Sequence, residues 1–424
     1  MDSLPPLVLE SLDFEESCFA NGPATEDDFY QVPKDAGNTA LGNIIKVEEN
    51  VNTTKYLLPP ASALSRILYQ SEDLRGVPVP ASAFVLWPYS PRSQQDGYAV
   101  VGWGHGTSGI TANGAPSNHK SLFQNWLAPF ELALNGYVVV APDYAGLGVS
   151  KTASGEPIEH EYLACSSHAN DLVYAIQAAR QHFPALSKNF VVIGHSQGGG
   201  AAWATARRQA LTPVAGYLGA VAISPIVNIL EQPNPVFRQA VVAATTLGAQ
   251  SAFPDFKAED VLTEEGQQCL ATMKSSNAQL AGLILLTLGK VLMKEGWMEN
   301  LHLQKYNSLA SQGGKKIGSP LLVVHGEDDE RLDVNATTEA VEGTSKNFPS
   351  SQIECVLLPG ITHTPALTAS LKLWMDWIAD RFAGKEIESG HQRITKLTPA
   401  RPTACYKGEQ NWYMEAATQF YHAP

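Results

Sequence analysis

The sequence predicts an α/β protein with a mostly parallel, doubly wound sheet and an inserted helical lid or cap. Two observations lead to this prediction. Short, continuous apolar runs alternate with segments of helical periodicity, which is typical of parallel strands buried on both faces. The alternation stops over residues 227–316, where only helix-like segments occur. We therefore expect one α/β core whose helical insertion lies over the carboxyl ends of the strands, the edge where such sheets bind ligands.

Size and charge exclude several classes of protein. The chain has 424 residues, 44% of them hydrophobic, and a formal net charge of −13. This composition is ordinary for a globular protein with a large core. An acidic chain without a cluster of Lys and Arg is not expected to bind nucleic acid. No apolar stretch is long enough to span a membrane, so no membrane span is predicted. The oligomeric state stays open.

The start of the chain and its cysteines bear on location. The first twenty residues lack the basic start and the apolar centre of a signal peptide. The five cysteines form an odd, scattered set without C-x-x-C spacing, which favours free thiols in a reducing compartment. We therefore expect a cytoplasmic protein, with secretion as the alternative.

Changes in pattern along the chain suggest four regions. An acidic, proline-punctuated arm covers residues 1–40, and the α/β core is assigned to residues 41–226 and 317–385. Residues 227–316 form the cap, and residues 386–424 form a carboxyl-terminal tail. The aromatic residues of the tail predict that it docks on the core. These aromatic residues are Tyr406, Trp412, Tyr413, Phe420 and Tyr421.

The strands are predicted in two groups. The first three runs are separated by turns and suggest an antiparallel start to the sheet; they cover residues 44–47, 65–69 and 81–87. The later runs are continuously apolar and predict buried parallel strands; they cover residues 99–103, 137–141, 190–193, 218–223, 321–324 and 353–358. Helical stripes are expected at 168–183 and 367–382 in the core, and at 234–247, 267–273 and 278–294 in the cap.

The most informative motif is G-H-S-Q-G at residues 194–198. An apolar strand-like run precedes it, and a helix pattern of small residues follows. This is the strand–turn–helix context in which G-x-S-x-G presents a nucleophilic serine, because the flanking glycines leave room for a strained turn. The alternative, a glycine-rich turn that contains a serine by chance, does not explain both flanking elements. We predict that Ser196 is the nucleophile.

A serine nucleophile needs a base, and the base needs an acid that orients it. In this architecture the acid and then the histidine follow the serine along the chain, each after a strand. Asp329 follows one apolar run and is the predicted acid, with Asp328 and Asp333 as alternatives. His363 follows the last run and is the predicted base.

Acyl transfer also needs donors for the developing negative oxygen. The backbone N–H of Gln197, directly after the nucleophile, is one predicted donor. Thr107, in the loop G-H-G-T, supplies the other, and its hydroxyl or the side chain of Asn113 could add a third. Three more histidines are expected to support the site. They are His105, His195 and His325. The histidine and carboxylates near residue 325 make only a weak metal pattern, so neither a metal nor another cofactor is predicted.

Several motifs together resemble the fungal secretory lipase family, the group of Candida antarctica lipase A. They are D-F-Y at 28–30, L-Y-Q-S at 68–71, G-H-G-T at 104–107, A-P-S at 115–117, P-D-Y-A-G-L-G at 142–148, G-H-S-Q-G at 194–198 and G-E-D-D at 326–329. The resemblance covers about residues 26–385. It implies an α/β-hydrolase fold, a helical lid before the acid-bearing strand, and a triad of Ser196, Asp329 and His363 that hydrolyses esters without a cofactor.

Two features depart from the family's pattern. The family usually carries a secretion signal, which this sequence does not show, and often has a cysteine where this chain has Gly114. We therefore expect a non-secreted relative that cleaves a carboxylic ester of a hydrophobic small molecule, such as a polyketide or terpenoid intermediate of fungal secondary metabolism. The alternatives are an acyltransferase or cyclase with the same triad, a true lipase acting on acylglycerols, and a peptidase. A non-catalytic binding protein would be expected to lack one triad member.

Overall fold

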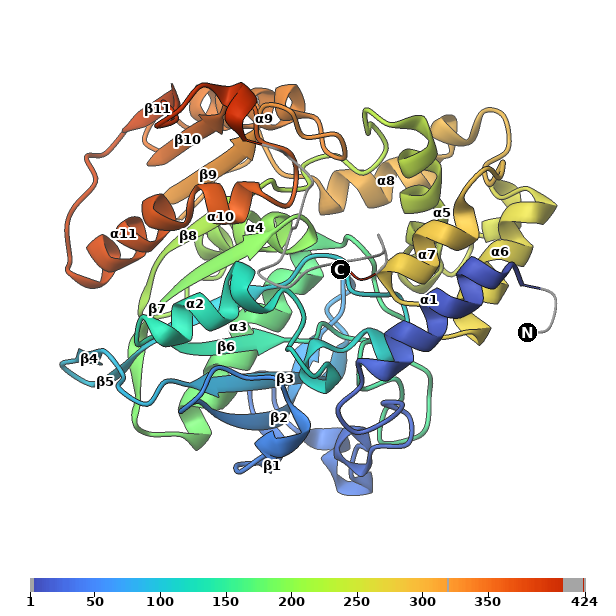
Figure 1. Cartoon of the computed structure of the whole chain (residues 1–424), viewed down its shortest axis with the longest axis horizontal. Coiled ribbons are helices and arrows are strands. Elements are labelled where there is room, and N and C mark those ends of the chain that lie inside the picture. The colour runs from blue at the N-terminus through green and yellow to red at the C-terminus, as the bar shows by residue number, and fades with distance from the viewer. Residues whose placement is uncertain (1–3, 319, 407–421, 423–424) are drawn as a thin grey trace.

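The computed structural model describes residues 4–318, 320–406 and 422. Eleven strands form one sheet, in the order β1-β2-β3-β6-β5-β7-β8-β9-β10-β11, with β4 paired to β5 outside this path. Helices cover both faces of the sheet, and a further group of helices stands beside it (Figure 1). The predicted sheet with helices on both faces is confirmed.

The sheet begins with antiparallel strands, as the separated runs predict. β1 (Ile44–Glu48) pairs with β2 (Ala63–Glu72), and β2 pairs along its full length with β3 (Pro78–Trp87). β3 is also antiparallel to β6 (Val138–Pro142). These strands extend one side of the sheet away from the site described below.

The remaining main strands are parallel, as continuous burial on two faces predicts. They are β5 (Gly97–Gly104), β7 (Leu186–His195), β8 (Tyr217–Ile223), β9 (Leu321–Gly326), β10 (Ile353–Leu358) and β11 (Gln392–Lys396). The two-residue β4 (Ser93–Gln94) is antiparallel to β5. β11 lies in the region assigned to the tail and was not predicted as a strand. Its side chains are mostly exposed, so its sequence lacks the apolar run of a buried strand.

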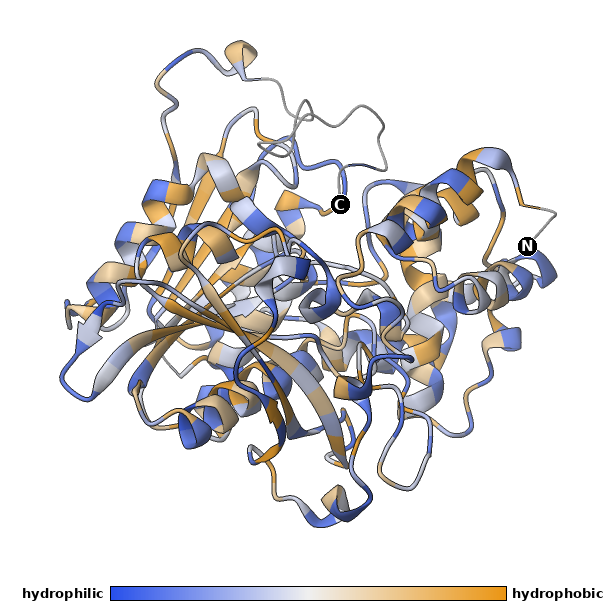
Figure 2. Ribbon diagram, turned by 60° about the horizontal axis from the view of Figure 1, so that its bottom comes forward, coloured by the Kyte–Doolittle hydropathy of each residue, from blue (hydrophilic) through white to orange (hydrophobic). Residues whose placement is uncertain are grey.

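Adjacent residues of the central strands face opposite layers. Val191 packs with the helices on one face and Val192 with those on the other, and both are fully buried. Figure 2 shows these strands as the most hydrophobic part of the core. The helices of the first face are α2 (Pro129–Leu134), α10 (Ala366–Ala369) and α11 (Leu371–Phe382). Those of the second face are α3 (Cys165–His182), α4 (Gln197–Leu211) and α9 (Val334–Asn347).

The stripe predicted at 367–382 is divided into α10 and α11. Ser370 separates the two helices with φ −102° and ψ 7°, and its hydroxyl donates to the carbonyl of Ala366. A serine hydroxyl that bonds the carbonyl four residues earlier often bends a helix. The apolar stripe nevertheless continues across the break, which is why the sequence reads as one helix.

Between β8 and β9, the described residues form helices and no long strand. They are α5 (Pro235–Ala252), α6 (Glu264–Ser275), α7 (Leu280–Thr287) and α8 (Leu301–Ala310), and they share one apolar cluster. The predicted helix over 278–294 is too long, since α7 ends at Thr287. Gly289 follows with φ +75°, and Met293 forms a bridge with Leu262 instead of continuing the helix. The boundaries of the cap as a domain stay a prediction.

The amino-terminal arm contains a helix that packs on the cap. α1 (Pro6–Ser17) lies against α7, and the two are side by side in Figure 1. The carboxylate of Glu15 accepts the backbone N–H groups of Gln279 and Gly282, at 2.9 and 3.0 Å. Glu15 therefore caps the amino end of α7, where backbone N–H groups have no partner within the helix.

Residues 386–406 run along β10 and its following loop. Of the tail's aromatic residues only Tyr406 lies within the described residues, with 38% of its surface exposed. Trp412, Tyr413, Phe420 and Tyr421 lie outside them, so the docking of the tail stays a prediction. Over the described part of the chain, no helix is both long and apolar enough to cross a membrane.

Candidate active site

Ser196 occupies a strained turn between β7 and α4. Its φ of +59° and ψ of −116° are unusual for a residue with a side chain. The flanking glycines are required by space, since a Cβ on Gly198 would lie 1.9 Å from the carbonyl oxygen of Gly104. A Cβ on Gly194 would lie 2.1 Å from the carbonyl oxygen of Gly198. The turn therefore projects the serine from the carboxyl end of β7, as the motif predicts.

The carboxyl ends of β9 and β10 bring the other two predicted residues together. Nδ1 of His363 donates to Oδ2 of Asp329 at 2.7 Å. The side chain of Asp329 is fully buried, and that of His363 is 4% exposed. His195, next to Ser196 in the chain, has its ring centroid 4.7 Å from that of His363. The turn of Ser196 and the His363–Asp329 pair thus lie at the same edge of the sheet, after β7, β9 and β10, and their use as a triad stays a prediction.

Asp329 is held as an anion by four donors. Its Oδ1 accepts the backbone N–H groups of Arg331 and Leu332, both at 2.9 Å. Its Oδ2 accepts Nε2–H of His325 at 3.0 Å besides the bond from His363. Burial alone would raise the pKa of Asp329, but the positive charge of His363 and the donors from His325 and His363 outweigh it. The pKa therefore lies well below its usual range.

The two alternative acids point elsewhere. Asp328 is exposed to solvent. Asp333 is the residue before α9, and its side chain accepts the backbone N–H of Asn335. Only Asp329 of the three carboxylates contacts His363. His325 contributes a supporting hydrogen bond to Asp329, in keeping with the role expected for it.

The backbone of His363 is also fixed. Nε2 of His195 lies 3.2 Å from the carbonyl oxygen of His363, and the hydroxyl of Ser224 donates to the same oxygen at 3.3 Å. On the other side, the N–H of His363 donates to Glu330 at 3.4 Å. The imidazole is therefore oriented through its main chain as well as through Asp329.

The predicted oxyanion donors lie on two neighbouring segments. Gln197 is the first residue of α4, so its backbone N–H has no acceptor within the helix. In the facing loop, the N–H of Gly106 donates to the side chain of Gln124 at 2.7 Å, which leaves Thr107 as the next N–H along the loop. The Thr107 hydroxyl donates to Oε1 of Gln197 at 3.3 Å and lies 3.0 Å from Tyr162 Oη.

The side-chain oxygen of Asn113 binds another part of the chain, and the use of its amide as an additional donor stays a prediction. Its Oδ1 accepts the backbone N–H of Ala24 at 2.8 Å, and the residue is buried. Asn113 therefore fastens the amino-terminal arm to the loop below the site. The sequence could not show this, because the partner is a backbone group 89 positions away.

A buried stack of aromatic rings lies beneath the oxyanion loop. The ring of Tyr144 stacks between His105 and His168, with both centroid distances 4.3 Å, and His160 stacks on His168 at 5.2 Å. Burial lowers the pKa of each of the three histidines to about 3. Nε2 of Gln197 lies 3.2 and 3.0 Å from Nε2 of His160 and His168, so these neutral rings accept its two N–H groups. His160, His168 and Gln124 were not predicted as supporting residues, since no local motif marks them.

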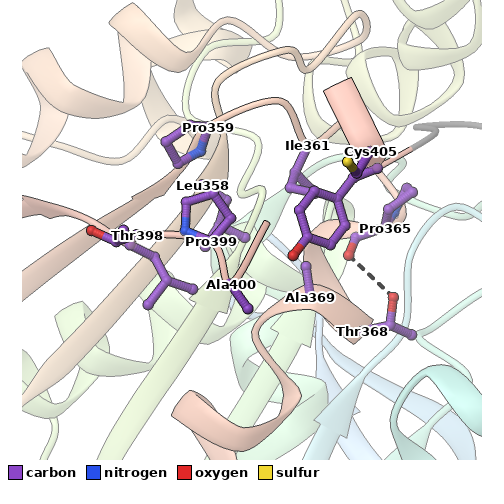
Figure 3. A pocket seen from close by; sticks show the side chains of 12 residues that line it. Leu358, Pro359, Ile361, Pro365, Thr368, Ala369, Thr398, Pro399, Ala400 and Cys405 are labelled. Atoms are coloured by element: carbon purple, nitrogen blue, oxygen red, sulfur yellow. Dashed lines mark hydrogen bonds between the residues drawn. The ribbon is translucent and has the colours of Figure 1, made fainter. Parts of the chain in front are cut away.

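An apolar pocket lies behind the loop that carries His363. Its volume is about 610 Å³, and it is lined by the loop after β10, by α10 and by the segment after β11. Figure 3 shows Ile361 and Pro365, on either side of His363 in the sequence, along one wall, with Cys405 nearby. Thr368 donates to the carbonyl of Pro365 at 3.2 Å and so stiffens this wall.

A comparison with models of protein families shows to which family this chain belongs. The family model Hydrolase_4, described as "Serine aminopeptidase, S33", matches residues 117–367, which is more than half of the chain. The chain belongs to this family. The match contains all three residues of the candidate triad. This Hydrolase_4 protein is therefore a member of the α/β-hydrolase superfamily, as predicted.

Individual relatives agree with the family. Lipase 5 of Candida albicans is 24% identical over 413 residues, covering 88% of this chain and 84% of that protein. Candida antarctica lipase A has a similar fold, with a TM-score of 0.71 at 16% identity, and 89% and 90% of the two chains are covered. The rice cell wall degrading esterase LipA of Xanthomonas oryzae has a TM-score of 0.64 at 18% identity, covering 82% of this chain and 100% of that one. The comparisons support a hydrolase of lipase and esterase type, and the predicted resemblance to the lipase A group is confirmed.

Proposed function

We propose that this Hydrolase_4 protein cleaves a carboxylic ester of a hydrophobic small molecule through an acyl-enzyme on Ser196. The observation that carries the proposal is the buried hydrogen bond between His363 and Asp329, at the sheet edge where the strained turn presents Ser196. The names of the relatives, lipases and an esterase, support an ester as substrate.

Each residue has a distinct role in the proposed reaction. Ser196 Oγ attacks the carbonyl carbon while Nε2 of His363 accepts its proton, and Asp329 stabilises the imidazolium. The negative oxygen of the tetrahedral intermediate binds the backbone N–H groups of Gln197 and Thr107. His363 then protonates the leaving alcohol, and water attacks the acyl-enzyme by the same route in reverse.

The first test uses the serine itself. We expect Ser196→Ala to lower kcat on p-nitrophenyl esters by at least about 10³-fold while the thermal unfolding midpoint stays within a few degrees. A fluorophosphonate probe should label the peptide that contains Ser196 in the wild type only. Unchanged turnover in Ser196→Ala, or labelling elsewhere, contradicts the proposal.

A panel of different substrates tests the proposed substrate class. We expect medium-chain and bulky hydrophobic esters to be cleaved faster than emulsified long-chain triglyceride or aminoacyl p-nitroanilides. Preference for triglyceride would indicate a true lipase, and preference for the anilides would indicate a peptidase. Analysis of products in the presence of alcohols separates hydrolysis from acyl transfer or cyclisation. A role in fungal secondary metabolism and a cytoplasmic location are part of the proposal, and metabolite profiling and cell fractionation test them.

A further inference from the structure

Gln124 connects the oxyanion loop to His195, whose ring reaches the carbonyl oxygen of His363. Its Oε1 accepts the backbone N–H of Gly106 at 2.7 Å, one residue before Thr107. Its Nε2 lies 3.0 Å from Nδ1 of His195. The side chain belongs to a residue that is only 6% exposed, so water does not compete for these bonds. Gln124 thus contacts both halves of the site without reaching the reacting atoms.

The hydrogen bonds define where the proton of His195 resides. Because Oε1 of Gln124 is the acceptor for Gly106, its amide nitrogen must donate to Nδ1 of His195. Nδ1 is then unprotonated, and the single proton of a neutral ring lies on Nε2. Burial, reinforced by the nearby His363, lowers the pKa of His195 well below its usual value and keeps the ring neutral. Nε2–H therefore donates to the carbonyl of His363, 3.2 Å away.

The backbone that presents Gln124 is strained. Leu122, Phe123 and Gln124 have φ values of +55°, +46° and +49°, three left-handed residues in succession. Each costs about 1–2 kcal/mol relative to the right-handed conformation, and such residues normally occur singly. The turn is held by burial of Leu122 and by the ring of Phe123, whose centroid lies 6.1 Å from that of His105. Strain of this kind persists where the surrounding structure fixes it, commonly at functional sites.

We propose that Gln124 is a positioning residue that sets the oxyanion loop and His363 at a fixed distance from one another, acting through His195. The inference rests on the proposed function, since it assigns Gln124 a part in the same reaction. Gly106, Gln124, His195 and the His363 carbonyl form one continuous chain of hydrogen bonds. Breaking the chain at Gln124 removes the link between the two, so the oxyanion N–H of Thr107 can shift relative to His363, which Asp329 and Ser224 still hold.

The kinetic test compares three single variants and one double variant. We expect Gln124→Leu and His195→Phe each to lower kcat by about 10- to 100-fold with KM within about threefold, because misplacement by about 1 Å costs rate rather than binding. The double variant should lose no more than about threefold beyond the slower single, since both act along one path. Gln209→Leu is the matched control. Gln209 is also 6% exposed and bonds a backbone N–H, that of Val214, but it lies at the far end of α4.

A second measurement does not depend on any variant folding. The ¹⁵N chemical shifts of His195, assigned in the wild type by selective ¹⁵N-histidine labelling and sequential connectivities, should show an unprotonated Nδ1 and a protonated Nε2. A proton on Nδ1 overturns the proposal, as does a Gln124→Leu variant that keeps kcat within about twofold of the wild type, or additive losses in the double variant. Full activity of Ser196→Ala would instead overturn the proposed function, so the two failures are distinguishable.

Discussion

Nδ1 of His363 donates to Oδ2 of Asp329 at 2.7 Å, and the same oxygen accepts Nε2–H of His325 at 3.0 Å. One buried carboxylate oxygen therefore orients the candidate base and is itself oriented by a second imidazole. The other carboxylate oxygen of Asp329, Oδ1, accepts two backbone N–H groups. The arrangement leaves Asp329 ionised and nearly immobile, which is what a base that must keep one tautomer requires.

The first prediction concerns this carboxylate. Asp329→Asn should lower kcat by about 1,000- to 10,000-fold, because an amide can donate to His363 and thereby favour the wrong tautomer. Asp328→Asn, on the exposed neighbour, is the control and should stay within about twofold of the wild type. Steady-state kinetics on a soluble ester check both variants. Equal losses in the two would mean that the acidic loop acts by its charge alone.

The glycines of the elbow give a prediction about stability. Gly198→Ala places a Cβ 1.9 Å from the carbonyl oxygen of Gly104, so β5 and α4 must separate. We expect the free energy of unfolding to fall by more than about 3 kcal/mol, or soluble protein to be lost. Gly37→Ala is the control, since a Cβ there meets nothing within 4 Å. Denaturant unfolding measures both. Similar stabilities would show that the backbone at the turn adapts freely.

The capping carboxylate of Glu15 predicts a dependence on pH. Burial raises its pKa from 4.5 to about 7, although the backbone N–H groups of Gly282 and Gln279 oppose the shift. The folded state therefore binds a proton that the unfolded state has lost between these values. Its contribution to stability is complete below about pH 4.5 and is lost as pH rises through about 7.

Glu15→Gln isolates this contribution from those of other buried acids. The slope of the unfolding free energy between pH 4.5 and 7 should become less negative in this variant than in the wild type, by roughly 1–3 kcal/mol over the interval. Glu16→Gln, on an exposed neighbour in the same helix, should leave the slope unchanged. Urea unfolding at several pH values provides the data. Parallel curves for wild type and Glu15→Gln would contradict the assignment.

A fourth prediction concerns the buried histidines. Their pKa values of about 3 lie far below those of exposed imidazoles, so unfolding near pH 5 should take up protons at His105, His160 and His168. Their contribution to stability is present above about pH 6.5 and is lost as pH falls toward 3. Proton uptake can be measured by calorimetric unfolding in buffers of different ionisation enthalpy. Because buried carboxyl groups such as Glu161 and Asp171 release protons on unfolding at the same pH, the decisive quantity is the difference between the wild type and His160→Gln. Equal proton uptake in the two proteins would contradict the assignment.

Much of the site could be predicted from the sequence because its parts are local. Ser196 is marked by glycines within two residues of it, and Asp329 and His363 each follow an apolar run that becomes a strand. The glycines are required because the turn at Ser196 leaves no room for a Cβ, and the apolar runs are required because each strand is buried. The sequence therefore indicated the sheet, the pairing of His363 with Asp329 and the edge at which the candidate triad lies.

The features that the sequence did not predict depend on contacts between distant segments of the chain. Gln124 has no motif around it, and its three-residue left-handed turn contains no glycine. α7 ends at Thr287 although apolar residues continue, because Met293 turns back to Leu262. The side-chain oxygen of Asn113 accepts the backbone N–H of Ala24, 89 positions away in the chain. Tertiary partners override local preference in each case, and no single window of sequence contains both partners.

The way α1 is fastened has a mechanical consequence. One side of the helix is tied to the cap through Glu15, while the residues just after it are tied to the core, where Ala20 donates to Asn118 and Phe19 forms a bridge with His119. Asn118 and His119 lead directly into the turn that presents Gln124. α1 thus connects the helices between β8 and β9 to the α/β core. Deleting α1 would remove the contact that caps α7 and would also weaken the hold on the segment that leads to Gln124.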